Sequence, residues 1–322
     1  MRAATVTEFG GPEVLHLVEQ PDPVPGRGEV VVAVEVADTL WLETVVRSGV
    51  GQDYWPMRPP YVPGNGVAGR LASIGPGVDD SWVGRRVVAH TGNEGGYADR
   101  AVVPANGLSL VPDALDLEVA ASLLHDGPTS LALFEVTRVG PQDVVLVVGA
   151  SGGLGILSVQ LGRARASKVV AVARGPKLAR VRELGPAAVI DSEQPDWVAQ
   201  VRTWLPDTGA DVVLDNIGGT VGEAAFALAG SGGRFSAHGT PSGRFAAIAT
   251  AEAERRRVTV TGIERVQMSD ADRKRYTEQA LDEAVSGTFA PVIGQTFPIE
   301  EAARAHAAIE GRQIFGKTLL TM

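Results

Sequence analysis

The 322-residue sequence contains no cysteine. This absence excludes disulfide bonds, thiol nucleophiles and zinc sites built from thiolates. The histidines do not stand at the i, i+4 spacing, or at another close spacing, that is typical of metal ligands. They are His16, His90, His125, His238 and His306. We therefore expect no metal site.

Long apolar runs are also lacking. The sequence has no uninterrupted stretch of about 18 apolar residues, as a membrane-spanning helix requires, and its first 20 residues lack the apolar core of a signal peptide. The formal net charge is −9, and the one basic cluster, "ERRR" at 254–257, follows acidic residues. A phosphate backbone would be repelled by this charge. We therefore expect a soluble, cytoplasmic protein that binds neither membrane nor nucleic acid.

The composition is that of an ordinary globular protein, with 44% hydrophobic and 21% charged residues. A chain of this length is long enough for two hydrophobic cores. Its first 110 residues or so contain short apolar runs, such as 29–37, between turns rich in proline and glycine. This pattern predicts a small, barrel-like β domain.

From residue 144 onward, apolar runs alternate with segments that are able to form helices. Six such runs stand at 144–148, 168–173, 187–190, 211–215, 233–238 and 258–262. Buried strands joined by helical crossovers are typical of an α/β fold. The sequence therefore predicts a doubly wound parallel sheet of six strands.

The first of these runs leads directly into the glycine turn "GASGGLG", residues 149–155. Because glycine has no Cβ, a pyrophosphate can approach the backbone, and the following helix offers free N–H groups at its start. Gly149, Gly152 and Gly155 give the spacing GxxGxxG, whereas the strict GxGxxG pattern would need glycine in place of Ala150. Together with the surrounding strands, the turn predicts a dinucleotide site.

The second run indicates which dinucleotide binds. Sites for NAD place an acidic residue at the end of the second strand, about 20 residues after the glycines, but no Asp or Glu occurs between Gly155 and Glu183. Arg174 ends the strand instead, and Lys177 follows it. A guanidinium and an ammonium suit the 2′-phosphate of NADPH. The alternative is that both are solvated cations on a surface loop.

With these features in place, the chain resembles the zinc-independent quinone oxidoreductase branch, the zeta-crystallin type, of the medium-chain dehydrogenase/reductase superfamily. The segments that carry the resemblance include "FGGPEVL", "PYVPGNGVAG", "GGYADRAVVP", "GASGGLG", "VVLDNIGG" and "GKTLLTM". It implies a GroES-like β-rich catalytic domain made of residues 1–118 and 265–322. It also implies a Rossmann domain, residues 119–264, that binds NADPH. The missing cysteines agree with a branch that works without zinc.

The resemblance also implies a set of cofactor-binding residues. At the pyrophosphate these are Ser151, Gly152, Gly153 and Leu154. Toward the nicotinamide and its ribose they are Thr129, Asn216, His238, Gly239 and Thr240, and at the adenosine end Ser192. The family commonly forms homodimers through the edge strand of the Rossmann sheet, here 258–262, which would also protect that edge.

The expected substrate pocket departs from the family pattern. Leu40 and Val45 stand where relatives carry an asparagine and a tyrosine. We therefore expect a more apolar pocket, shaped by these two residues together with Trp41 and Trp55.

Reducing a quinone or an activated enone needs a hydride donor, a fixed geometry and a source of protons, which can be water. Tyr54 and His238 are candidate catalytic proton donors. The alternatives are that Tyr54 is an aromatic residue lining its loop and that His238 satisfies a local hydrogen bond.

The sequence thus predicts an NADPH-dependent, zinc-independent oxidoreductase that transfers hydride to a small quinone or α,β-unsaturated carbonyl. One alternative is an enoyl-thioester or ketone reductase of a biosynthetic pathway. Another is a crystallin-like protein that binds NADPH without catalysis.

Overall fold

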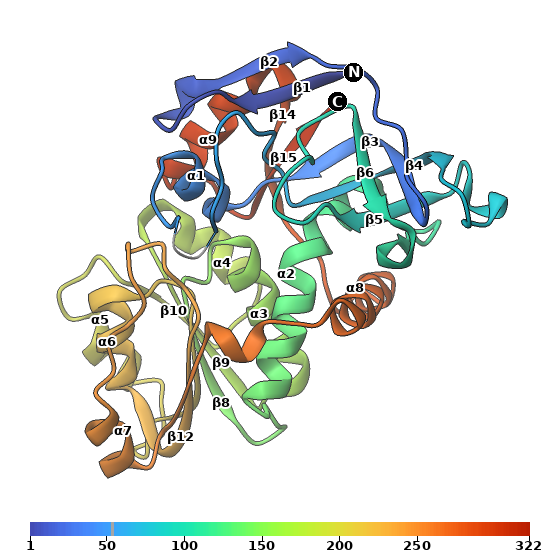
Figure 1. Ribbon diagram of the computed structural model, residues 1–322. Coiled ribbons are helices and arrows are strands. Elements are labelled where there is room, and N and C mark those ends of the chain that lie inside the picture. The colour runs from blue at the N-terminus through green and yellow to red at the C-terminus, as the bar shows by residue number, and fades with distance from the viewer. Residues whose placement is uncertain (53–54) are drawn as a thin grey trace. The chain divides into compact units, whose positions relative to one another are not determined.

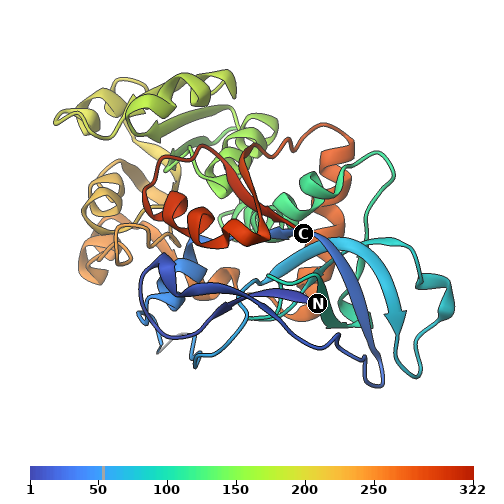
Figure 2. The same cartoon turned by 90° about the horizontal axis from the view of Figure 1, so that it is seen from above.

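The computed structural model describes residues 1–52 and 55–322, which form two units (Figure 1). Unit 1 is made of Met1–His125, Asp270–Val285 and Pro291–Met322. Unit 2 is made of Asp126–Ser269 and Ser286–Ala290. Both chain ends belong to unit 1, where they lie close together in Figure 1 and in the view from above in Figure 2.

Unit 1 is rich in β-structure. Its strands are β1 (Arg2–Val6), β2 (Leu15–Glu19), β3 (Glu29–Asp38), β4 (Gly66–Ile74), β5 (Arg86–His90), β6 (Arg100–Pro104), β7 (Ser109–Leu110), β14 (Ile293–Pro298) and β15 (Lys317–Thr321). Strands β1 and β2 form an antiparallel pair, and the others form a sheet of order β14-β15-β3-β4-β5-β7, to which β6 adds by pairing with β3. The apolar run that predicts a strand at 29–37 becomes β3, the long strand at the centre of this sheet.

The last segment of the chain completes unit 1. Strand β15 pairs antiparallel with β3 and parallel with β14. Unit 1 also contains the helices α1 (Trp41–Arg47), α8 (Asp270–Val285) and α9 (Ala302–Glu310) and the short 3₁₀ helices η1 (Pro12–Val14), η2 (Asp80–Trp82), η3 (Ala105–Gly107) and η6 (Ile299–Glu301). Helix α9 buries Ala302, Ala305 and His306, so residues near both ends of the chain contribute to one hydrophobic core.

Unit 2 contains the predicted six-stranded parallel sheet, which confirms the α/β fold class. Its strands are β8 (Val144–Val148), β9 (Lys168–Ala173), β10 (Ala188–Asp191), β11 (Ala210–Asp215), β12 (Ala229–Ala237) and β13 (Thr259–Gly262). Their order is β10-β9-β8-β11-β12-β13, and every pairing is parallel. All five residues of β8 are buried, as expected for a central strand that is covered on both faces.

Helices connect these strands. They are α3 (Gly153–Arg165), α4 (Leu178–Glu183), α5 (Trp197–Arg202), α6 (Gly219–Phe226) and α7 (Thr250–Arg256), with the short helices η4 (Gly175–Lys177) and η5 (Ile263–Val266). Figure 1 shows α5, α6 and α7 on one face of the sheet and α3 on the other. A further helix, α2 (Leu117–Val136), spans the point at which the chain passes from unit 1 into unit 2. Among the described residues, no helix combines the length and the apolar character that crossing a bilayer requires.

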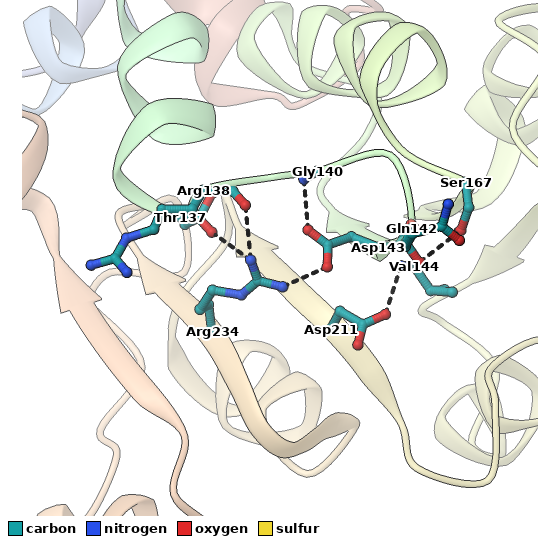
Figure 3. A network of polar contacts seen from close by, with 9 residues as sticks. All are labelled: Thr137, Arg138, Gly140, Gln142, Asp143, Val144, Ser167, Asp211 and Arg234. Atoms are coloured by element: carbon teal, nitrogen blue, oxygen red, sulfur yellow. Dashed lines mark hydrogen bonds and ion pairs between the residues drawn. The ribbon is translucent and has the colours of Figure 1, made fainter.

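A network of polar contacts secures the amino-terminal edge of this sheet (Figure 3). Arg234 on β12 donates to the carbonyl oxygens of Thr137 and Arg138 at 3.1 and 2.9 Å and to Asp143 Oδ1 at 2.6 Å. The second oxygen of Asp143 accepts the N–H of Gly140 at 2.7 Å. The network joins the loop before β8 to β12, at the end of the sheet opposite the glycine turn.

Candidate functional site

The strand order of unit 2 reverses between β8 and β11, which are neighbours in the sheet. In open parallel sheets, ligands bind outside the carboxyl ends of the strands at such a reversal. Three segments singled out in the sequence follow strands at this edge: the glycine turn after β8, Asn216 after β11, and His238 after β12. The fold therefore brings these segments together.

Two glycines of the turn are required by its geometry, each for a different reason, whereas Gly152 is not. Gly149 has a φ of 77°, which favours glycine. A Cβ on Gly155 would lie 2.2 Å from the carbonyl oxygen of Gly149, so this glycine lets α3 start directly against the turn. Gly152 is exposed, and a Cβ there would meet nothing within 4 Å. The turn is thus close-packed where Gly155 meets Gly149 and open to solvent at Gly152.

The open side of the turn presents the start of α3. The first bond inside this helix runs from the N–H of Ile156 to the carbonyl oxygen of Gly152 at 2.9 Å. The N–H groups of Gly153, Leu154 and Gly155 precede this bond, and such groups favour an anion. Ser151, Gly153 and Leu154 are half-buried at the same place. The geometry fits the pyrophosphate of a dinucleotide.

Arg174 lies at the carboxyl end of β9 and is not a lone cation. Its Nε and Nη2 donate to Glu193 Oε1 at 3.1 and 2.8 Å, and both side chains are about half exposed, at 54% and 47%. Lys177 is half-buried in η4, on the loop that follows. The two predicted phosphate ligands therefore share a loop, but the guanidinium of one of them already holds a carboxylate.

Asp191 connects this loop to the loop after β10. Its Oδ1 accepts the N–H groups of Gly175 at 3.2 Å and of Glu193 at 3.0 Å, and these bonds lower the pKa of Asp191. Ser192 donates both its N–H, at 2.9 Å, and its hydroxyl, at 3.2 Å, to the carbonyl oxygen of Ala173. Ser192, predicted at the adenosine end, thus lies beside the loop that carries Arg174.

The sequence analysis missed Asp191 and Glu193. It considered acidic residues only between Gly155 and Glu183, whereas Asp191 ends β10 and Glu193 follows it. The signal was available, because the classic doubly wound fold places its third strand beside its second, and parallel strands end at the same edge.

Asn216 and His238 form a buried pair. His238 shares hydrogen bonds with Asn216 Oδ1 through Nε2, at 2.9 Å, and with Ser236 Oγ through Nδ1, at 3.1 Å. Asn216 Nδ2 donates to the carbonyl oxygen of Val148 at 2.8 Å, which ties the pair to β8. Burial lowers the pKa of His238 to about 4, so the ring is neutral at physiological pH. This geometry favours a positioning role over proton donation.

The neighbouring backbone is equally constrained. A Cβ on Gly239 would lie 1.9 Å from the carbonyl carbon of Asn216, so only glycine fits there. Asp215 Oδ1 accepts the N–H groups of Ile217 and Gly218 at 3.0 and 2.9 Å, while burial raises the pKa of its carboxyl group. Two further predicted residues are half-buried, Thr240 on this loop and Thr129 on α2.

The residues predicted to line the substrate pocket belong to unit 1. Leu40, Trp41 and Val45 are half-buried at and within the first turns of α1. Trp55, by contrast, is 7% exposed and part of the hydrophobic core. Tyr54, the other candidate proton donor, lies outside the described residues.

A buried polar cluster, Glu43, Tyr97 and His306, lies next to this segment and was missed by the sequence analysis. Tyr97 donates its hydroxyl proton to Glu43 Oε2 at 2.6 Å, and its oxygen lies 3.1 Å from His306 Nε2. Glu43 also accepts the N–H groups of Leu40 and Asn65, both at 2.9 Å. Burial raises the pKa of Glu43 to about 7 and lowers that of His306 to about 3. The cluster holds the backbone of Leu40, which we expect to line the pocket.

Comparison with known proteins agrees with this architecture. Residues 26–113 match a family model described as the alcohol dehydrogenase GroES-like domain, and residues 184–320 match one described as zinc-binding dehydrogenase. The quinone oxidoreductase of Rattus norvegicus is 31% identical over 318 residues, which cover 96% of this chain and 94% of the rat protein. The chain belongs to the quinone oxidoreductase branch of the medium-chain dehydrogenase/reductase superfamily. It is therefore an oxidoreductase, as predicted.

Two further relatives show how the branch varies. A 2-haloacrylate reductase from a Burkholderia species is 29% identical over 99% of this chain and 98% of its own. A mycobacterial protein solved in complex with NADPH is 30% identical, with a TM-score of 0.89 over all of both chains. The superfamily and the combination of a GroES-like with a Rossmann domain are thus confirmed.

One of the matching family models carries a zinc-binding description, but the sequence has no cysteine to supply a thiolate. Within residues 1–52 and 55–322, no group of three or more histidine, aspartate or glutamate side chains is placed to hold a metal ion. Zinc independence stays a prediction, which a metal analysis of the purified protein would test.

Proposed function

We propose that the chain is an NADPH-dependent, zinc-independent reductase of a quinone or an α,β-unsaturated carbonyl compound. The observation that carries the proposal is the carboxyl edge of the six-stranded sheet, where the open glycine turn and Arg174 follow neighbouring strands. The mycobacterial relative complexed with NADPH supports the choice of cofactor. The 2-haloacrylate reductase supports the choice of substrate class, because a haloacrylate is an α,β-unsaturated acid.

When bound, NADPH supplies the hydride. Ser151, Gly152, Gly153 and Leu154 hold the pyrophosphate at the start of α3, and Arg174 with Lys177 holds the 2′-phosphate. Asn216 and Gly239 position the ribose, since the buried His238 fixes Asn216. Residues of unit 1 around Leu40 and Val45 bind the substrate.

The proton for the reduced product comes from water in this proposal. His238 is hydrogen-bonded at both ring nitrogens, and its pKa of about 4 means that the imidazolium, its acidic form, is not populated at neutral pH. For hydride transfer to such a substrate, the relative positions of the hydride donor and the acceptor matter more than a strong acid.

The decisive experiment is a panel of acceptors assayed with NADPH and NADH in parallel. We expect loss of NADPH absorbance with quinones or enones. Activity on enoyl thioesters or ketones alone would favour the alternative biosynthetic reductase. Tight NADPH binding without oxidation by any acceptor would favour a non-catalytic, crystallin-like protein.

The cofactor has its own test. Arg174→Ala should weaken NADPH much more than NADH, because a charge-assisted hydrogen bond contributes about 1.5 to 3 kcal/mol. Arg182→Ala, an exposed cation at the end of α4, serves as the control. Equal affinities of the native protein for both nucleotides would rule out the NADPH assignment.

We also propose a homodimer that pairs β13 with its twin. This strand is one edge of the sheet, and Thr259 and Val260 on it are exposed. Pairing two such edges would continue the sheet across both subunits. Light scattering of the native protein and of Val260→Lys tests this: a native dimer that the charged residue weakens is expected, and a native monomer would refute it.

A further inference from the structure

Glu193 forms an ion pair with Arg174, the residue on which the proposed assignment of NADPH depends. Its Oε1 accepts from both Nε and Nη2 of Arg174, at 3.1 and 2.8 Å. The other oxygen of Glu193, Oε2, lies 3.0 Å from the position that a Cβ on Gly175 would take. The carboxylate therefore lies directly over the Arg174–Gly175 backbone, where the 2′-phosphate of a nucleotide is expected.

The fold holds Glu193 in this place. Asp191 Oδ1 accepts the N–H of Glu193 and also that of Gly175, so one carboxylate joins the two loops. Between them, Ser192 donates its N–H and its hydroxyl to the carbonyl oxygen of Ala173. The loop after β10 is thus bound at three consecutive residues to the loop after β9, and Glu193 lies next to Arg174 as a consequence.

We infer that Glu193 is a specificity-determining residue: its carboxylate competes with the 2′-phosphate for the Arg174 guanidinium and so reduces the preference for NADPH over NADH. This inference rests on the proposed binding of the 2′-phosphate by Arg174. A carboxylate and a phosphate cannot both take the same edge of a guanidinium, and their negative charges repel each other at this distance. A 2′-hydroxyl carries no charge and meets no such opposition.

The experiment compares 2′,5′-ADP with 5′-AMP, which differ only in the 2′-phosphate, by calorimetric binding to the full chain. The proteins are the native form, Glu193→Gln, Arg174→Ala and the double variant. Removing the competing carboxylate should tighten 2′,5′-ADP about two- to fivefold, the range of an exposed ion pair, and leave 5′-AMP unchanged. The gain should shrink as salt is raised.

Two comparisons make the result specific. Glu183→Gln removes an exposed carboxylate from the end of α4 and should change neither affinity, which controls for net charge. In the Arg174→Ala background, Glu193→Gln should not increase the affinity for 2′,5′-ADP, because the guanidinium for which the carboxylate competes is missing. Equal melting temperatures of native protein and Glu193→Gln would show that the loop is intact.

The outcomes separate this inference from the proposed function. If Arg174→Ala weakens 2′,5′-ADP while Glu193→Gln changes nothing, the inference is wrong and the cofactor assignment stands. A gain of the same size in the Arg174→Ala background would also overturn it, because competition requires the arginine. If the native protein binds both nucleotides equally and Arg174→Ala alters neither, both the assignment and the inference fail.

Discussion

Polar side chains are used differently in the core of unit 1 and at the Arg174 loop of unit 2. Unit 1 buries them and pairs them with one another: Lys317 with Asp38, and Glu43 with Tyr97. At the carboxyl edge of the sheet in unit 2, the glycine turn offers backbone groups, and the ion pair between Arg174 and Glu193 is about half exposed. Side chains in the first arrangement maintain the fold, whereas the second leaves charge accessible to a ligand.

The difference has an energetic basis. A buried ion has lost its hydration, so losing its partner is costly, while an exposed ion pair is screened by water and contributes little to stability. Substitutions at the buried polar pairs of unit 1 should therefore change stability, and substitutions at Arg174 should change ligand binding. The predictions below test this contrast.

The largest effect is expected at Lys317, whose side chain is 6% exposed and whose Nζ lies 2.8 Å from Asp38 Oδ1. Lys317→Met would leave a buried carboxylate without this cation and should lower the free energy of unfolding by about 3 to 5 kcal/mol. Chemical denaturation, with hydrogen exchange in β3 and β15, measures it. Adding Asp38→Leu should recover most of the loss, and Lys168→Met, at an exposed lysine, should cost little. A loss no larger than that of Lys168→Met would contradict the contrast.

The next effect separates two glycines of one turn. Gly155→Ala places a Cβ 2.2 Å from the carbonyl oxygen of Gly149, and such overpacking should destabilise unit 2 by about 1 to 3 kcal/mol. It should also weaken nucleotide binding, because the start of α3 must move. Gly152→Ala meets nothing within 4 Å and should leave stability nearly unchanged. Equal losses in the two variants would show that the turn is not packed as described.

These cases show which features a sequence can predict. The six strands were predictable because continuous apolar runs such as Val144–Val148 are typical of a sheet covered on both faces. The glycine turn was predictable because all of its parts are local. The bond between Glu43 and Tyr97 spans 54 residues and that between Tyr97 and His306 spans 209. Only the tertiary structure brings such groups together, and no spacing in the sequence predicts their contact.

The third prediction concerns pH and Glu43. Because its folded pKa is about 7, above the ordinary 4.5, the folded protein binds this proton more tightly than the unfolded chain does. The stabilisation from Glu43 is therefore complete below about pH 4.5 and is lost as the pH rises through about 7, by an amount on the order of 1 to 3 kcal/mol. Glu43→Gln removes this dependence.

The measurement is the difference in unfolding free energy between native protein and Glu43→Gln from pH 4.5 to 8. Taking the difference is necessary because His90 and His306 act in the opposite direction: burial lowers their pKa values to about 3, so they destabilise the fold as the pH falls below about 6.5. The native protein should lose its advantage over the variant as the pH rises. A flat difference curve would mean that Glu43 is ionised throughout.

The smallest effect on stability is expected at Arg174. Its ion pair with Glu193 is exposed at both ends, and removing such a pair changes the free energy of unfolding by less than about 1 kcal/mol. Arg174→Ala should therefore melt within a degree or two of the native protein while its affinity for 2′,5′-ADP falls. A large loss of stability would place Arg174 with the structural side chains of unit 1, and the contrast between the two units would not hold at this residue.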